Sequence, residues 1–260
     1  MPAKGNMSNR TADSQGLVLC LTNTVAANFT ANVLLAIGAK PAMIEEPSEA
    51  AELAAVADAV LVNVGTVTPA QADAMRAAIA VCKGDATPKG DATFLSREKK
   101  SPAIPWVLDP VACHLLAYRR ELVREFLGDR PSLVRGNLAE IRYLQQNFPS
   151  SVGSVPMLAT GEKDQIFRGQ TLLREICGGV WMLQEVTATG CAQGAVCAAY
   201  LAWGQTPFDA CISASHLMKR AGERAYEKAK TPGSFKIALV DALYELMHSE
   251  AGREGAPRTV

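Results

Sequence analysis

The sequence has no excess of charge of either sign and no long apolar run. Its 260 residues include 26 Lys and Arg against 26 Asp and Glu, so neither a basic nucleic-acid surface nor a charged tail stands out. No apolar run approaches the roughly 18 residues of a membrane span. Residues 1–15 are polar and lack the apolar centre of a secretory signal. We therefore expect a cytoplasmic protein with neither nucleic acid nor membrane as a partner.

Paired cysteines and metal-type histidine spacing are missing too. None of the seven cysteines forms a C-x-x-C pair, and an odd count predicts reduced thiols, most of them packed as small hydrophobes. The three histidines, His114, His216 and His248, lack metal-ligand spacing. No Ser-His-Asp arrangement can be argued from the sequence.

What the sequence does contain is an alternation of short apolar strands with helical segments. Strand-like runs cover 17–21, 59–66, 104–110, 132–137 and 155–161, and helical patterns lie between most of them. Residues 190 to 250 read as helices. This order predicts βαβ units, and so an α/β fold with a mainly parallel central sheet flanked by helices. We expect one domain over 16–250, an inserted loop at 83–100, and tails at 1–15 and 251–260.

Five of these strand-like runs end in polar side chains. Ligands of parallel sheets bind beyond the carboxyl ends of the strands, so these side chains should line one rim. The residues are Asn23, Asn63, Asp109, Asn137 and Thr160. The set predicts a polar active-site edge.

The stretch "TATGCAQGA", 187–195, predicts a turn that joins a strand to a helix. Backbone N–H groups at a helix start form an anion site, and Gly190 permits close approach; tight packing alone would also explain the small residues. The stretch is neither a Walker loop nor a dinucleotide fingerprint, because it lacks G-K-[ST] and G-x-G-x-x-G. Cys191 begins the helix, where the same field is expected to lower its pKa.

Two further stretches combine polar residues at useful spacings. In "RGNLAEI", Asn137 and Glu140 can face one point and suit Mg²⁺, or form an N-cap with a first-turn acid. In "LDPVACHLLAYRR", Asp109 ends a strand, and Arg119 or Arg120 can stabilise a phosphoryl group or stay solvated. Spacing alone leaves both alternatives open.

Seven stretches, taken in order, resemble hydroxyethylthiazole kinases of the ribokinase-like fold. They are "LTNTVAANFTANVLLAIGAKPAMIEE", "VLVNVGT", "VLDPVA", "VRGNLAEI", "ATGEKD", "VTATGCAQGA" and "TPGSFKIALVDALYEL". They cover most of residues 17 to 247, and the first stretch and the RGN-x-x-EI block are specific to the family.

The resemblance implies transfer of the γ-phosphoryl of ATP to the hydroxyl of 4-methyl-5-(2-hydroxyethyl)thiazole, with Mg²⁺, by a homotrimer whose thiazole lies near a subunit boundary. It implies that Cys191 faces the substrate hydroxyl, where related sugar kinases place a catalytic Asp. The other implied sites are thiazole contacts at Met43, Asn23 and Ala188, nucleotide or phosphate contacts at Arg119, Thr160, Thr189, Gly190 and Asn137, and Mg²⁺ contacts at Asp109 and Glu140.

The chain departs from the family pattern in several places. Ala188 replaces a glycine, which costs about 1 kcal/mol if the site needs positive φ. Residues 112–116, "ACHLL", replace a glycine-rich run that borders the phosphates. The 141–156 region is about twenty residues shorter than in the family pattern, which implies a missing helix and strand portion. These departures favour a degenerate homologue with little turnover as the alternative, and a kinase for another small vitamin-related alcohol as a third hypothesis.

Overall fold

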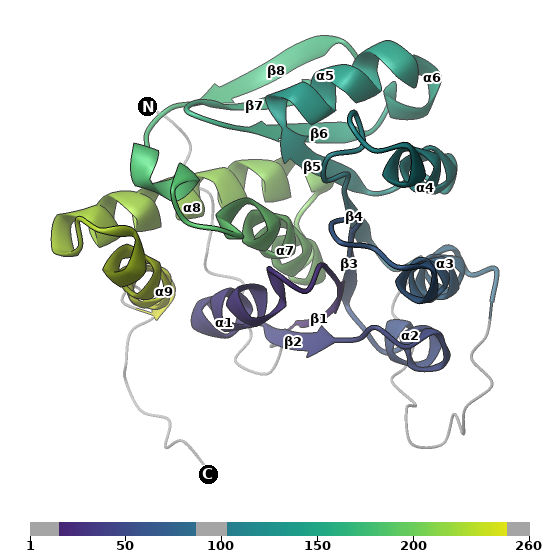
Figure 1. Ribbon diagram of the computed structural model, residues 1–260, viewed down its shortest axis with the longest axis horizontal. Helices are drawn as coiled ribbons and strands as arrows, with labels where there is room; N and C mark the ends of the chain where they lie inside the picture. The colour runs from purple at the N-terminus through teal and green to yellow at the C-terminus, as the bar shows by residue number, and fades with distance from the viewer. Residues whose placement is uncertain (1–15, 87–102, 249–260) are drawn as a thin grey trace.

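In the computed structural model, which describes residues 16–86 and 103–248, the strands form one eight-stranded sheet (Figure 1). The strand order is β2-β1-β3-β4-β5-β6-β7-β8. The strands are β1 (Leu17–Leu21), β2 (Lys40–Met43), β3 (Ala59–Asn63), β4 (Trp106–Asp109), β5 (Leu133–Asn137), β6 (Pro156–Thr160), β7 (Asp164–Arg168) and β8 (Thr171–Ile176).

The first six strands are parallel, and β7 and β8 extend the sheet in antiparallel fashion. Parallel neighbours need crossover connections, usually helices, which explains the alternation in the sequence. The crossovers are α1 (Ala27–Ile37), α2 (Pro47–Ala54), α3 (Pro69–Lys83), α4 (Ala117–Gly128), and α5 (Leu138–Asn147) with α6 (Pro149–Val152). The predicted α/β class with a mainly parallel sheet is confirmed.

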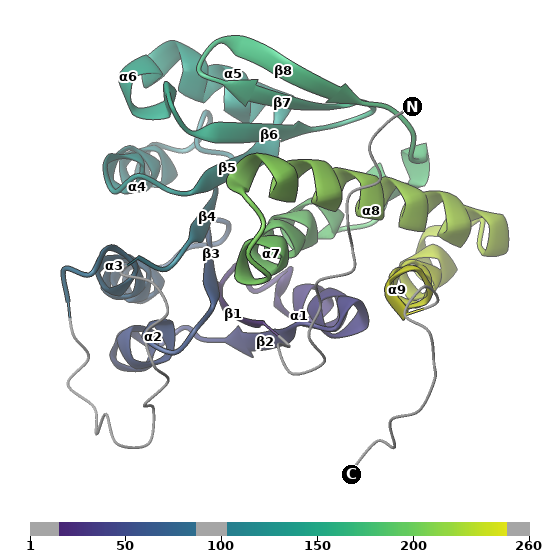
Figure 2. The same ribbon diagram turned by 180° about the vertical axis from the view of Figure 1, so that it is seen from behind.

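Each face of the sheet packs against its own helices (Figures 1 and 2). Val18, Cys20 and Leu61 belong to one buried cluster, which includes α1, α7 (Thr189–Ala202), α8 (Pro207–Lys228) and α9 (Pro232–His248). Leu19 and Val60 belong to the other, with α2 to α6. Successive strand residues point to opposite faces, so a strand buried on both sides reads as a continuous apolar run.

Two expectations about local structure are wrong. Residues 183–186 are not a strand before the "TATGC" turn, because Trp181–Gln184 form a 3-10 helix, η2. Gly178 and Gly179, both at positive φ, turn the chain out of the sheet after β8. The loop expected at 83–100 starts later, since Lys83 belongs to α3; most of that segment, like residues 1–15 and 251–260, lies outside the described residues.

The sheet is unbroken between β5 and β6, where the resemblance implied a missing helix and strand portion. Val134 pairs with Met157 and Asn137 with Thr160 in parallel register, while α5 and the single-turn α6 complete the crossover. Among the residues that the structure describes, no helix is long and apolar enough to span a membrane.

Candidate active site at the carboxyl ends of the strands

Polar side chains from β1 to β6 meet at one edge of the sheet, as the sequence predicted. The strand order reverses at β1, which has β2 on one side and β3 on the other. Such a switch point opens a crevice for ligands. Asn23 follows β1, while Asn63, Asp109, Asn137 and Thr160 end β3, β4, β5 and β6.

Hydrogen bonds join these strand ends into a line. Asn23 Nδ2 donates to Asn63 Oδ1 at 3.0 Å, and Asn63 Nδ2 donates to Asp109 Oδ2 at 2.7 Å. Asp109 Oδ2 lies 3.5 Å from Arg135 Nη1, and Arg135 Nη2 donates to Thr160 Oγ1 at 2.5 Å. We call this set, together with the Cys191 that Asn23 contacts, the polar line. It crosses five strand ends without a gap.

Cys191 lies in the first turn of α7 and accepts a hydrogen bond from Asn23, the residue at the β1 end of the polar line. Asn23 Nδ2 donates to Cys191 Sγ at 3.4 Å. The expected fall in its pKa is wrong: burial, and secondly the charge of Asp109, raise the pKa of the Cys191 thiol. Desolvation disfavours the thiolate more than the helix start favours it. The thiol is therefore neutral near pH 7 and suited to contact rather than proton removal.

Arg135 is a candidate site residue that no sequence motif predicted. Its side chain is only 9% exposed and lies against the start of α7, where a Cβ on Gly190 would be 2.5 Å from Arg135 Nη2. A side chain at position 190 would therefore require the guanidinium to move. A cation facing the positive end of a helix is unfavourable unless an anion lies between or beside them. Asp109 offers one negative charge, and a bound phosphate would be attracted by both groups.

The start of α7 has no side-chain cap. Ala188, its N-cap, has no polar side chain, and the Thr189 hydroxyl donates to the carbonyls of Leu183 and Val186 instead. The first-turn N–H groups are thus left without a side-chain acceptor, as an anion site requires.

A cavity of about 500 Å³ opens beside Arg135 and the start of α7. It lies between the ends of β5 and β6, η2 and α8. Four of the residues expected to contact nucleotide lie together in its wall: Asn137, Thr160, Thr189 and Gly190. Its size suits a ligand of nucleotide dimensions.

Asp109 is completely buried. Burial raises its pKa to about 7, while Arg135 opposes the shift and Glu140 adds to it. Its Oδ1 atom is buried without a partner among the described residues. A carboxylate oxygen left open in this way fits one ligand of Mg²⁺, although no group of three His, Cys, Asp or Glu side chains gathers in the described part of the chain.

Asn137 and Glu140 form a capping box, which their spacing had left open as the alternative to a Mg²⁺ site. Asn137 Oδ1 accepts from the Glu140 N–H at 2.9 Å, and Glu140 Oε2 accepts from the Asn137 N–H at 2.8 Å. Glu140 Oε1 accepts from the Ala112 N–H at 2.7 Å. These backbone contacts hold the loop after β4 to the start of α5 and leave Glu140 only its remaining lone pairs for a metal-bound water.

Two other expected residues lie apart from the cavity. Arg119 is on α4, where Nη1 donates to the Val111 carbonyl at 3.3 Å, and it is absent from the cavity wall. Met43 is half-buried at the end of the edge strand β2. The structure therefore brings Arg135, rather than Arg119, to the expected nucleotide contacts.

Two alanines adopt the left-handed conformation that favours glycine. Ala188 has φ 76° and Ala112 has φ 56°. Ala188 stands where the resemblance implies a glycine, and Ala112 begins the stretch that the resemblance implies to be rich in glycine. Ala188 therefore has the positive φ at which alanine lowers stability relative to glycine.

Ala188→Gly is expected to raise the free energy of unfolding by about 1 kcal/mol, because it removes the strain of positive φ. The melting temperature should rise by about 2 °C. Ala77→Gly, in the interior of α3, is the matched control and should lower stability by a similar amount. Calorimetric melting of both variants checks this, and an Ala188→Gly variant less stable than the parent would contradict it.

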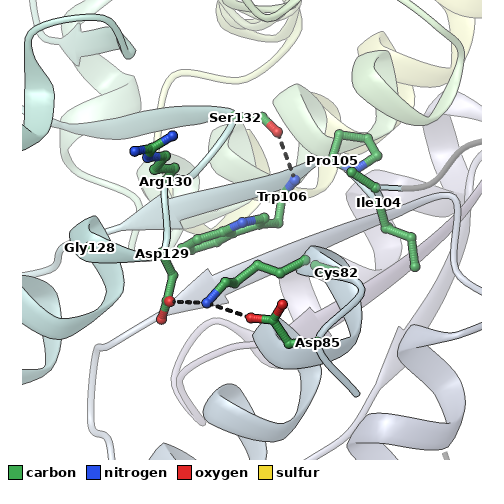
Figure 3. A pocket seen from close by; sticks show the side chains of 11 residues that line it. Cys82, Asp85, Ile104, Pro105, Trp106, Gly128, Asp129, Arg130 and Ser132 are labelled. Atoms are coloured by element: carbon green, nitrogen blue, oxygen red, sulfur yellow. Dashed lines mark hydrogen bonds and ion pairs between the residues drawn. The ribbon is translucent and has the colours of Figure 1, made fainter. Parts of the chain in front are cut away.

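A larger cavity, of about 760 Å³, lies at the opposite, amino-terminal end of the sheet (Figure 3). Three of its charged residues pair with one another: Lys83 Nζ lies 2.6 Å from Asp129 Oδ1 and 2.8 Å from Asp85 Oδ2. Ser132 Oγ accepts from the Trp106 N–H. Among the described residues, no buried side-chain polar atom in its wall lacks a hydrogen-bond partner. This cavity therefore has fewer polar groups free to bind a ligand than the smaller one.

The fold is that of ribokinase-like α/β proteins. A pyridoxal kinase from Staphylococcus aureus, solved with AMP-PCP and pyridoxal, superposes with a TM-score of 0.54 at 16% identity, covering 81% of this chain and 89% of that chain. A ribokinase-like superfamily protein from Enterococcus faecalis V583 gives 0.57 at 16% identity, with 92% and 90% covered. At these identities the likeness concerns the fold alone.

The chain belongs to the hydroxyethylthiazole kinase family. The family model matches residues 9–89, 92–154 and 150–249. The hydroxyethylthiazole kinase of Escherichia coli (strain K12) is 38% identical over 252 residues, 88% of this chain and 89% of the relative. The structure of the Pyrococcus horikoshii OT3 hydroxyethylthiazole kinase has a TM-score of 0.74 at 31% identity, covering 89% of this chain and 88% of that one.

Proposed function

We propose that this protein is an active kinase that transfers the γ-phosphoryl group of ATP to the primary hydroxyl of 4-methyl-5-(2-hydroxyethyl)thiazole, in thiamin salvage or biosynthesis. The observation that supports this most is the polar line. It runs from Cys191 and Asn23, beside the expected thiazole contacts, to Arg135 and Thr160 at the 500 Å³ cavity.

Phosphoryl transfer depends on positioning and on stabilising charge. In this proposal ATP lies in the cavity, with its phosphates at Arg135, Gly190 and the N–H groups of the first turn of α7. The thiazole lies beside Met43, Asn23 and Ala188. Bound Mg²⁺, held by Asp109 and through water by Glu140, would neutralise phosphate charge.

The neutral Cys191 thiol serves as a polar contact that orients the substrate hydroxyl. Cys191→Ala is then expected to lower kcat about tenfold, as for the loss of one hydrogen bond, with an unchanged KM for ATP. A general base would cost 10² to 10⁴-fold. Steady-state phosphorylation of the thiazole alcohol measures this, with Cys197→Ala, buried further along α7, as the control. Undiminished turnover by Cys191→Ala would remove Cys191 from the mechanism.

The alternative is a homologue that binds thiazole or nucleotide with little turnover. Its support is the positive φ of Ala188 and Ala112, at positions where the resemblance implies glycine or a glycine-rich run. Titration calorimetry separates the two: heat of binding for ATP and thiazole without product would establish the alternative, and Ala188→Gly would then be expected to restore turnover.

We further propose a homotrimer with the thiazole near a subunit boundary. Met43 is half-buried on an edge strand, where a neighbouring copy would complete its surroundings. A cytoplasmic location agrees with seven cysteines that are all free. Sedimentation analysis tests the trimer directly.

A further inference from the structure

The ammonium group of Lys219 lies inside a cage of oxygen atoms at the wall of the nucleotide cavity. Its Nζ donates to the carbonyls of Glu162 at 2.9 Å, Gly178 at 3.1 Å and Gly161 at 3.3 Å. Asp164 Oδ1 is 3.4 Å away. The side chain is 7% exposed, so four oxygens replace water around a buried cation.

Two stretches of the chain supply these oxygens. Gly161, Glu162 and Asp164 lie in the turn between β6 and β7 and at the start of β7, and Gly178 lies in the linker after β8. Lys219 itself projects from α8. The cation therefore joins α8 to both stretches, in addition to the pairing of β7 with β8, and Gly161 and Asp164 lie in the cavity wall.

The surrounding structure is shaped to present these oxygens. Gly178 has φ 101° and Gly179 φ 84°, and a Cβ on Gly179 would lie 3.1 Å from Lys219 Cγ. Glu223 Oε1 accepts from the Gly179 N–H at 2.7 Å, which fixes this turn to α8. Two left-handed glycines and a carboxylate thus hold the Gly178 carbonyl beside the ammonium group.

The cage is coupled to the start of α7. Asp164 Oδ2 accepts from Gln193 Nε2 at 3.0 Å, and Asp164 Oδ1 accepts from the Gly161 N–H at 3.1 Å. Gln193, Asp164 and Lys219 all lie in the wall of the cavity. A change in the cage would therefore reach the helix that holds the phosphates.

Three carbonyls and a carboxylate are ligands that also suit a hard monovalent cation. The ammonium group of lysine is a compact point charge of this kind on a flexible stem. We propose that Lys219 is a positioning residue that acts as a tethered monovalent cation: its ammonium group occupies an oxygen cage that a potassium or ammonium ion would fill in its absence, and it thereby shapes the nucleotide cavity.

Lys219→Ala tests this, because it removes the cation and leaves the cage. In a buffer free of potassium and ammonium, the melting temperature should fall by about 10 °C, as for a buried ion pair that loses one partner. Potassium or ammonium chloride at about 0.2 M should recover half of this loss or more. Tetramethylammonium chloride at equal ionic strength, too bulky for the cage, should recover none.

Two further variants sharpen the comparison. Lys219→Met fills the space of the lysine stem without a charge. Its melting temperature should also fall, and none of the three salts should restore it. Lys228→Ala, on the same helix but paired with Glu245 at the surface, should melt like the parent in all of them. Equal responses of Lys219→Ala to the three salts, or recovery of Lys219→Met by potassium, would overturn the proposal.

The effect on ATP rests on the proposed function and is measured separately. For Lys219→Ala without potassium, KM for ATP should rise at least tenfold while KM for the thiazole alcohol stays within twofold, and potassium should reverse the rise. If the parent protein shows no kinase activity, the proposed function fails, whereas the melting series still decides the role of Lys219. A salt-dependent melting temperature with an unchanged KM for ATP would overturn only the link to the cavity.

Discussion

Arg135→Met is expected to lower kcat/KM for ATP by about 10² to 10³-fold, as for the loss of one group that stabilises transition-state charge. The guanidinium is buried beside Gly190, where phosphate charge would develop. Methionine keeps much of the apolar stem but removes the charge. Because the pKa of Asp109 is already raised to about 7, that carboxyl can take up a proton when its cation is lost, and the fold should survive.

Arg119→Met is the matched control for this prediction. Arg119 is half-buried on α4 and lies outside the cavity wall, so its replacement should change kcat/KM by less than about threefold, the range of a minor surface effect. Steady-state kinetics and melting curves of both variants decide between the two arginines. The reverse order, with Arg119→Met the damaged enzyme, would restore the assignment that the sequence alone suggested.

The rate of ATP-dependent phosphorylation is expected to fall as the pH is lowered through about 7. Burial raises the pKa of Asp109 to about 7, and only its ionised form would pair with Arg135 and bind Mg²⁺. Below that pH, kcat/KM for ATP should fall about tenfold per pH unit. Asp109→Asn should lose about 10²-fold or more in rate, and its remaining activity should not fall between pH 7 and lower pH in this way.

The same raised pKa makes the folded state sensitive to pH in the opposite sense. The ordinary pKa of an Asp carboxyl is 3.8, and that of Asp109 in the folded protein is about 7, so the folded state binds the proton more tightly than the unfolded state. This proton binding adds about 4 kcal/mol to the free energy of unfolding below pH 3.8, and the contribution is lost as the pH rises through 7. Urea unfolding of the parent and of Asp109→Asn between pH 4 and 8 measures the difference. A constant difference across this range would contradict it.

The sequence predicted most of the central architecture because its signals are local. β1, β3, β4, β5 and β6 are buried apolar runs that end in polar residues, and each is found as a strand. The polar rim followed from the rule that parallel strands end at one edge. β2, β7 and β8 were missed, since β2 has no buried residue, β7 is only partly buried and β8 is largely exposed, and none of the three produces a clear apolar run.

The roles of Asn137 and Glu140 could be narrowed but not decided from spacing. Three residues apart at a helix start, they fit both a metal site and a capping box. The structure shows the capping box. It also shows that Glu140 accepts a hydrogen bond from the Ala112 N–H, which no local sequence pattern predicts. The pKa of Cys191 was predicted in the wrong direction for the same reason, since burial and the charge of Asp109 depend on distant parts of the chain.

By itself, the sequence determined the order of strands and helices, the α/β class and the polar residues at the strand ends, because periodicity and turn chemistry act between neighbours along the chain. Only the tertiary structure decided which of those residues meet. Arg135 faces Gly190, 55 positions later in the sequence, and Lys219 donates to carbonyls that lie 41 to 58 positions before it. Such contacts arise from the packing of elements far apart in the chain, where burial and charge are set by the whole fold.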